Sequence, residues 1–97
     1  MILDYIPFGR ANAITARELT SRTGYPTVRA LQQEIHRLRE SGSLILSATE
    51  FPQGYYQPEN DHEIVMFCRS MQSRITEIQK AVRPAWKYLN GDGDSIG

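Results

Sequence analysis

Arginine, glutamine and histidine side chains recur along one short segment of the sequence, residues 27–41. An arginine can bridge both hydrogen-bond acceptors of a guanine, and a glutamine can pair in the same two-pronged way with an adenine. We therefore expect Arg29, Gln32 and Gln33 to reach base edges of DNA, and the other candidates to contact phosphate. The full set of candidates in this region is Arg22, Thr27, Arg29, Gln32, Gln33, His36 and Arg37. The alternative is that these are the solvated side chains of an ordinary helix.

The segment 27–41 has the pattern of an amphipathic helix that would carry these groups on its outer side. Its apolar residues recur at helical spacing and predict a stripe that faces a core: Val28, Leu31, Ile35 and Leu38. The residues roughly opposite this stripe are Arg29, Gln33 and Arg37, and those at the edge of the outer face are Gln32 and His36. Either Tyr25 or Thr27 would cap the helix, and Gly42 would end it.

A shorter helix is expected just before this segment. Thr15 and Glu18 have the spacing of a capping box, in which the threonine hydroxyl accepts from the Glu18 amide and the glutamate side chain returns to the Thr15 amide. The helix would begin at about Ala16 and end just before Gly24, which supplies the left-handed residue that helix ends favour. Two helices joined by such a turn are typical of helix-turn-helix proteins. A further short helix is predicted at residues 2–6.

A β-hairpin is predicted directly after the two helices. Residues 44–46 form a short apolar run with β-branched content, residues 53–54 mark a turn, and residues 55–56 return as an aromatic strand. Residues 12–14 are expected to add a third strand to this small sheet. The order of elements is that of a winged helix-turn-helix, in which the hairpin is the wing.

The tip of the predicted wing, residues 49–54, offers few groups for an anion. Thr49 and Gln53 are the candidates to donate to phosphate. Glu50 is acidic, however, and no lysine or arginine occurs in residues 43–68. We therefore expect the wing to contribute little to affinity for DNA.

A long helix is predicted after the hairpin, with Asn60 and Glu63 as a second capping box. Its apolar residues are spaced four, three, four, three and four, which is the rhythm of a coiled coil: Ile64, Cys68, Met71, Ile75, Ile78 and Val82. We expect a homodimer that pairs through Cys68, Met71, Ile75, Ile78 and Val82; the alternative is that the helix folds back onto its own domain. Pro84 should end or kink the helix. Residues 90–97 are predicted to be a disordered tail.

Composition excludes several classes of protein. The 97 residues allow one compact domain, and 11 basic residues are offset by 11 acidic ones. Between Arg10 and Arg39, however, six arginines face two acidic residues, an excess that a phosphate backbone could use. One cysteine and two separated histidines provide no metal site, and no phosphate-binding loop or nucleophile paired with a base is present, so we expect neither an enzyme nor a cofactor. With no membrane span or signal peptide, the protein is expected to be cytoplasmic.

Several short motifs resemble those of the small winged-helix proteins of phages and prophages of Gram-positive bacteria. They are Leu-Arg-x-x-Gly at residues 38–42, Gly-Tyr-Tyr-x-Pro at residues 54–58 and Ser-x-x-Ser-Arg-Ile at residues 70–75. The resemblance covers roughly residues 13–83. It implies an α+β, mostly helical fold: a winged helix-turn-helix domain in residues 1–58 and a dimerisation helix in residues 59–89.

The function implied by this resemblance is sequence-specific binding of double-stranded DNA. The protein would be a phage or prophage transcriptional regulator or a replication-associated protein, with helix 27–41 in the major groove. The alternative is a winged-helix module that binds another protein, such as a replication or host factor, and no DNA. The low net charge and the uncharged wing favour this alternative, whereas the clustered arginines favour DNA.

Overall fold

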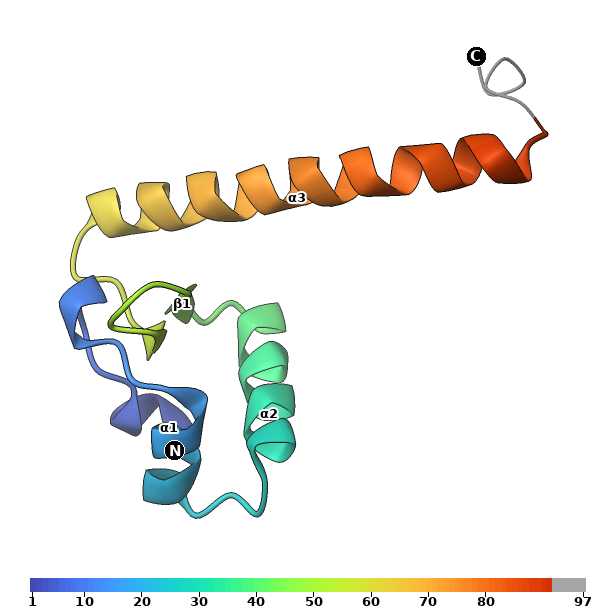
Figure 1. Ribbon diagram of the computed structural model, residues 1–97. Helices are drawn as coiled ribbons and strands as arrows, with labels where there is room; N and C mark the ends of the chain where they lie inside the picture. The colour runs from blue at the N-terminus through green and yellow to red at the C-terminus, as the bar shows by residue number, and fades with distance from the viewer. Residues whose placement is uncertain (92–97) are drawn as a thin grey trace. The chain divides into compact units, whose positions relative to one another are not determined.

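The structure, a computed structural model, describes residues 1–91. It is α+β and mostly helical, with three α-helices and one antiparallel β-hairpin among those residues (Figure 1). The described chain divides into two compact units, one of residues 1–67 and a second that begins at residue 68. The elements in chain order are η1 (Ile2–Tyr5), η2 (Arg10–Asn12), α1 (Ala16–Thr23), α2 (Val28–Glu40), β1 (Leu46–Ala48), β2 (Gly54–Tyr56) and α3 (Asp61–Leu89). Of the tail predicted to be disordered, residues 92–97 lie outside the described part of the chain.

Helices α1 and α2 begin at the capping residues that the sequence predicts. The Thr15 hydroxyl accepts from the amide of Glu18 at 3.1 Å, and the Thr27 hydroxyl accepts from the amide of Ala30 at 3.0 Å. Thr27, and not Tyr25, is therefore the cap of α2. Gly24 ends α1 in the left-handed conformation, with φ +78°.

The inner side of α2 is anchored in the core of residues 1–67. Leu31, Ile35 and Leu38 are at most 3% exposed, as their spacing predicts. Val28 was expected on the same stripe but is 37% exposed, because it lies in the first turn, next to the cap, where the helix extends past the core. The other buried members of the cluster come from the remaining elements of the unit: Ile2, Ile6, Ile14, Leu19 and Ile45.

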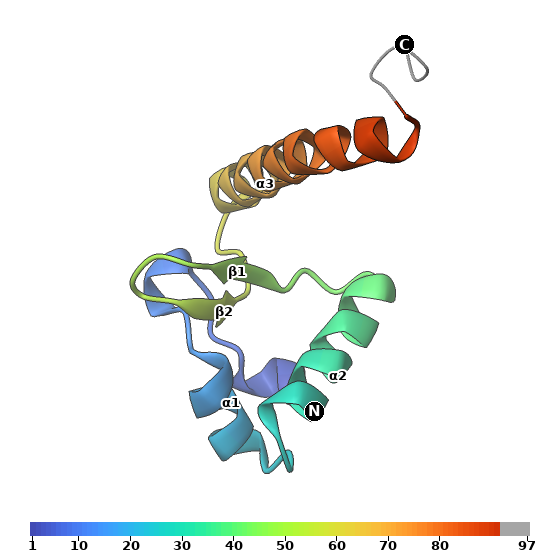
Figure 2. The ribbon, with the colours of Figure 1, turned by 45° about the vertical axis from the view of Figure 1, so that its right-hand side comes forward.

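Strands β1 and β2 lie side by side in an antiparallel hairpin (Figure 2). Leu46 pairs with Tyr56, and Ala48 pairs with Gly54. The first strand begins later than predicted, since Leu44 is 55% exposed and lies before the ladder. Gly54 was expected in the turn, but it is the first residue of β2 and the loop spans residues 49–53. A two-residue shift in strand boundaries is common for short strands, whose pattern is brief.

A third segment joins the hairpin through a single bridge at Ile14. The backbones of Ile14 and Tyr55 exchange two hydrogen bonds of 2.9 and 2.7 Å, so the strand expected at residues 12–14 is one residue long. Gly54 allows this approach, because a Cβ there would lie 1.9 Å from the carbonyl oxygen of Ile14. Ile14 precedes the cap of α1 by one residue, so the bridge fixes the start of α1 against the hairpin.

Arg10 connects three separate segments of the same unit. Its guanidinium donates to the carbonyl oxygens of Pro52 and Glu50 at 2.8 and 2.9 Å, and it lies over the ring of Tyr56 at 5.9 Å. Its backbone amide donates to the Glu63 carboxylate at 2.9 Å. Arg10 therefore holds the hairpin loop, residues 49–53, in place, a role that its sequence position does not predict.

Helix α3 begins as expected, with the Asn60 side chain accepting from the amide of Glu63 at 3.0 Å. The Glu63 carboxylate, however, accepts from the amide of Glu59 and not from that of Asn60. The helix then continues through Pro84 to Leu89, so of the two effects expected of the proline, an end or a kink, the end does not occur. Pro84 lies in an exposed turn, where water can satisfy the carbonyl group that proline leaves without a donor. Among the described residues, no helix is long and apolar enough to cross a membrane.

Candidate nucleic-acid interface

The outer face of α2 carries the polar groups that the sequence predicts. It also carries Glu40, which the sequence analysis did not place there. At 100° per residue, Arg29, Gln33 and His36 fall within about 60° of one another, on the side away from the buried stripe. All three side chains are exposed. Glu40 lies on the same face, where its carboxylate approaches His36 at 3.5 Å between Oε1 and Nε2. The spacing of four residues is the signal that predicts this pair.

Arg29 and Gln33 are the hydrogen-bond donors on this face whose side chains have no partner within the described chain. Neither side chain has a hydrogen bond or an ion pair within residues 1–91. They lie four residues apart, so they project from the same side of the helix, one turn from each other. A cation and an amide of this kind could turn toward an acceptor without breaking a contact inside the protein.

Arg37 is already engaged within its own helix. Its guanidinium donates from Nε to the Glu34 carboxylate at 2.8 Å, and Nη2 donates to the other carboxylate oxygen. These hydrogen bonds lower the pKa of the Glu34 carboxyl. A phosphate would therefore have to share Arg37 with a neighbouring carboxylate, which weakens it as an anion contact.

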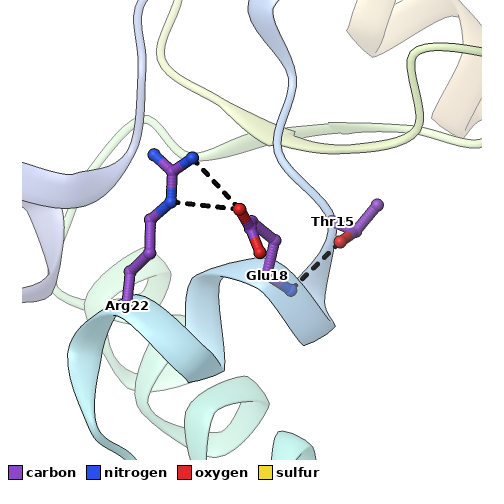
Figure 3. Close-up of polar contacts among 3 residues, drawn as sticks. All are labelled: Thr15, Glu18 and Arg22. Atoms are coloured by element: carbon purple, nitrogen blue, oxygen red, sulfur yellow. Dashed lines mark hydrogen bonds and ion pairs between the residues drawn. The ribbon is translucent and has the colours of Figure 1, made fainter.

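Arg22 is paired in the same way on α1. Its guanidinium lies 3.1 Å from the Glu18 carboxylate, which would otherwise complete the capping box at Thr15 (Figure 3). The pair is exposed on both sides, so it is worth little to stability. Glu18 nevertheless places a negative charge next to Arg22, which the sequence predicts to contact phosphate.

Arg39 belongs to the framework of the unit and not to its surface charge. It is half-buried, its Nε donates to the carbonyl of Ile45 at 2.7 Å, and the guanidinium lies over the ring of Tyr55 at 5.8 Å. Burial lowers the pKa of this group. Arg10 is engaged inside the unit as well. Of the six arginines between Arg10 and Arg39, only Arg17 and Arg29 have no partner within the described chain. The number of arginines free to bind a phosphate is therefore smaller than the sequence suggests.

Gln32 lies on the side of α2 that faces the hairpin. Its amide nitrogen is 3.4 Å from the hydroxyl oxygen of Tyr55, a long hydrogen bond across the two elements. The sequence grouped Gln32 with Arg29 and Gln33 as a base-reading residue. The geometry separates them, because Gln32 lies about 100° from Gln33 around the helix.

The hairpin loop, predicted to be the tip of a wing, presents mostly uncharged groups. Thr49 and Gln53 line an open hollow of about 480 Å³ between the hairpin and the start of α1. Phe51 is 93% exposed. The carbonyl oxygens of Glu50 and Pro52 accept hydrogen bonds from Arg10, so the loop is held through its backbone.

The residues assigned to dimerisation form an exposed stripe on α3. Cys68 is exposed and Met71 is half-buried. Ile75, Ile78 and Val82 are 46%, 61% and 41% exposed. Exposed apolar side chains repeated at this spacing are typical of a helix that pairs with another surface.

Chemistry that needs a metal has no visible site in the described chain. Within residues 1–91, no three histidine, cysteine or carboxylate side chains come together as a metal would require. The outer face of α2 instead offers hydrogen-bond donors, while the opposite side of the helix is buried in the core. No protein-family model matches the chain, and no similar curated protein or solved structure was found.

Proposed function

We propose that the protein binds double-stranded DNA through the outer face of α2, as a winged helix-turn-helix protein. The observation that carries this proposal is that Arg29 and Gln33 lie exposed and unengaged on a helix whose other side is buried at Leu31, Ile35 and Leu38. A major-groove helix needs this combination, since a loosely held helix would lose its register against the base pairs.

The order of elements supports the same proposal. A short helix, the single bridge at Ile14, two helices joined by a tight turn and a hairpin follow one another as in winged helix-turn-helix proteins. Arg29 would bridge the two acceptors of a guanine, and Gln33 would pair with an adenine. The resemblance to phage and prophage proteins favours a role in transcriptional regulation or replication.

The test begins with selection of duplexes from a random pool by the wild-type protein. Affinity for the selected sequence and for a scrambled one is then measured for the wild type and for the Arg29→Ala/Gln33→Ala variant. Each base contact contributes on the order of 1–3 kcal/mol of discrimination, so the variant should lose most of the difference. Arg17→Ala is the control, because it removes an exposed, unpaired arginine from α1 and should leave discrimination intact. An unchanged ratio in the double variant removes this face from the proposal.

A second candidate function, docking of a partner protein on the same face, is favoured by the charge of residues 1–67. This unit has six arginines against eight acidic residues, a net charge of −2. A negative surface is repelled by phosphate at long range. Failure of the wild type to enrich any duplex at low salt would support protein docking and exclude the DNA proposal.

The proposed DNA-binding unit acts as a homodimer through α3. The stripe from Cys68 to Val82 is exposed except at the half-buried Met71, and with Ile64 it spans about 27 Å at roughly 1.5 Å per residue. Two-fold pairing would present two α2 helices to one duplex and would require an inverted-repeat site. Ile78→Glu places a charge in the seam and should give monomers by light scattering, whereas Ser73→Glu, on another side of the helix, should not. A wild type that is monomeric at high micromolar concentration would exclude this pairing.

A further inference from the structure

The positive charge of this chain is concentrated on α3 and not on the helices of the candidate interface. Residues 68–91 contain five cationic residues and one acidic residue, a net charge of +4, whereas residues 1–67 have a net charge of −2. The cationic residues are Arg69, Arg74, Lys80, Arg83 and Lys87, and the acidic one is Glu77. A polyanion would be attracted to this helix more strongly than to the first unit.

Four of the five cations lie along one side of α3. Counted at 100° per residue, Arg69, Lys80, Arg83 and Lys87 fall within about 60° of one another. Thr76 lies in the same sector and Ser73 lies about 20° beyond its edge, so that two hydroxyl groups are added within about 80°. We call these six residues the basic stripe. Their spacings are four, three, four, three and four, and all six side chains are exposed.

The cations of the basic stripe are largely unengaged. Lys80 approaches Glu77 at 3.5 Å, a long and exposed contact. Arg69, Arg83 and Lys87 have no hydrogen bond or ion pair within residues 1–91. This contrasts with Arg22 and Arg37 of the first unit, each of which has a carboxylate beside it. These three cations can therefore bind an anion without losing an internal contact.

The basic stripe and the apolar seam lie on nearly opposite sides of α3. Their centres are about 140° apart around the helix axis. A helix that lies flat on a membrane has its apolar side inserted and its cations reaching up to the headgroups from the flanks. Cations on the far side are poorly placed for that. Two different partners, one on each side, fit the geometry better.

We propose that the basic stripe binds the phosphate backbone of duplex DNA, independently of base sequence, while the opposite side of α3 pairs with its copy. Its four cations extend over about 27 Å, the rise of 18 residues at roughly 1.5 Å each. B-form DNA presents one phosphate per 3.4 Å of each strand, so a helix of this length lies near several of them. The choice of duplex DNA over another polyanion rests on the proposed function.

The test is the salt dependence of binding to a random-sequence duplex. The variant Arg69→Gln/Lys80→Gln/Arg83→Gln/Lys87→Gln should give a slope of log affinity against log salt that is shallower by about 3 to 4, at about 0.9 per phosphate contact. The single variants Arg83→Gln and Arg74→Gln are the matched pair, since each removes one arginine from α3 and only the first lies in the stripe. Arg83→Gln should reduce the slope by about 0.9 and Arg74→Gln should not change it. Light scattering checks that every variant keeps the oligomeric state of the wild type.

An unchanged slope in the fourfold variant overturns the proposal. So does loss of binding to vesicles of anionic lipid with no change in the slope for DNA, which would assign the stripe to a membrane. Failure of the proposed function is recognised separately: Arg29→Ala/Gln33→Ala would then leave discrimination between selected and scrambled duplexes unchanged. The basic stripe is tested by the salt dependence of binding to a random-sequence duplex. Helix α2 is tested by the ratio of affinities for selected and scrambled duplexes, so either proposal can fail while the other holds.

Discussion

The close approach of Gly54 to Ile14 makes a quantitative prediction about how the hairpin is held. Replacing Gly54 by alanine would place a Cβ 1.9 Å from the Ile14 carbonyl oxygen, at a residue with φ +121°. The oxygen belongs to the backbone, so no side-chain rotation can relieve the overlap. The Ile14–Tyr55 bridge would have to open, with loss of its two hydrogen bonds of 2.9 and 2.7 Å.

The magnitude follows from two separate terms. An L residue held at such a φ costs on the order of 1–3 kcal/mol. Two hydrogen bonds add about 0.5–1.5 kcal/mol each. Gly42→Ala isolates the first term, because Gly42 has φ +106° and nothing lies within 4 Å of the point that an alanine Cβ would occupy there. Gly54→Ala should therefore be less stable than Gly42→Ala by about 1–3 kcal/mol.

The measurement is urea unfolding followed by circular dichroism for the wild type and both glycine variants. Equal stability of Gly54→Ala and Gly42→Ala would show that the bridge contributes nothing, and the reasoning would fail. A stable Gly54→Ala with weakened DNA binding would mean that the hairpin shifts without unfolding. That outcome would still separate the two variants by function, since Gly42 lies away from the bridge.

Three further substitutions test charges in the first unit. Glu34→Gln frees Arg37 and removes an acid, so affinity for random duplex should rise a few-fold, on the order of one phosphate contact, in a binding titration at low salt. Glu50→Lys should also tighten that binding, because it changes the side chain and leaves the carbonyl that Arg10 holds; weaker binding would mean that Glu50 makes a specific contact. Two backbone N–H groups lower the pKa of Glu63, so its stabilisation is present above the ordinary glutamate pKa and is lost as the pH falls through the lowered value. Glu63→Gln should be less stable than the wild type at neutral pH, with the difference shrinking in acid unfolding curves.

Local signals predicted most of the helical fold. Thr15, Thr27 and Asn60 each accept from an amide three residues on, because a helix start needs an acceptor and a short side chain supplies it. The periodicity of α2 predicted its buried side, except at Val28, where the first turn reaches beyond the core. These features depend on residues within one turn of each other, which is why a sequence displays them.

The features that the sequence did not predict depend on residues far apart in the chain. Arg10 holds carbonyls some 40 residues away, and the contact of Gln32 with Tyr55 joins a helix to a strand. A pattern within one segment carries no sign of such partners. The pairing of Arg37 with Glu34 is different, since its spacing of three residues is visible in the sequence and could have been predicted.

The distribution of charge bears on the proposal that this chain, which has no net charge, binds DNA specifically. Affinity for phosphate is independent of sequence, so every free cation near the recognition helix strengthens binding to all sites alike. In residues 1–67 most arginines are engaged, so under the proposed function discrimination would depend on a few unpaired donors such as Arg29 and Gln33. If the attraction to phosphate comes from the basic stripe of α3, its strength can change during evolution without altering the proposed base contacts of α2. Specificity and affinity would then be set on separate helices, and the ratio between correct and incorrect sites would depend on α2 alone.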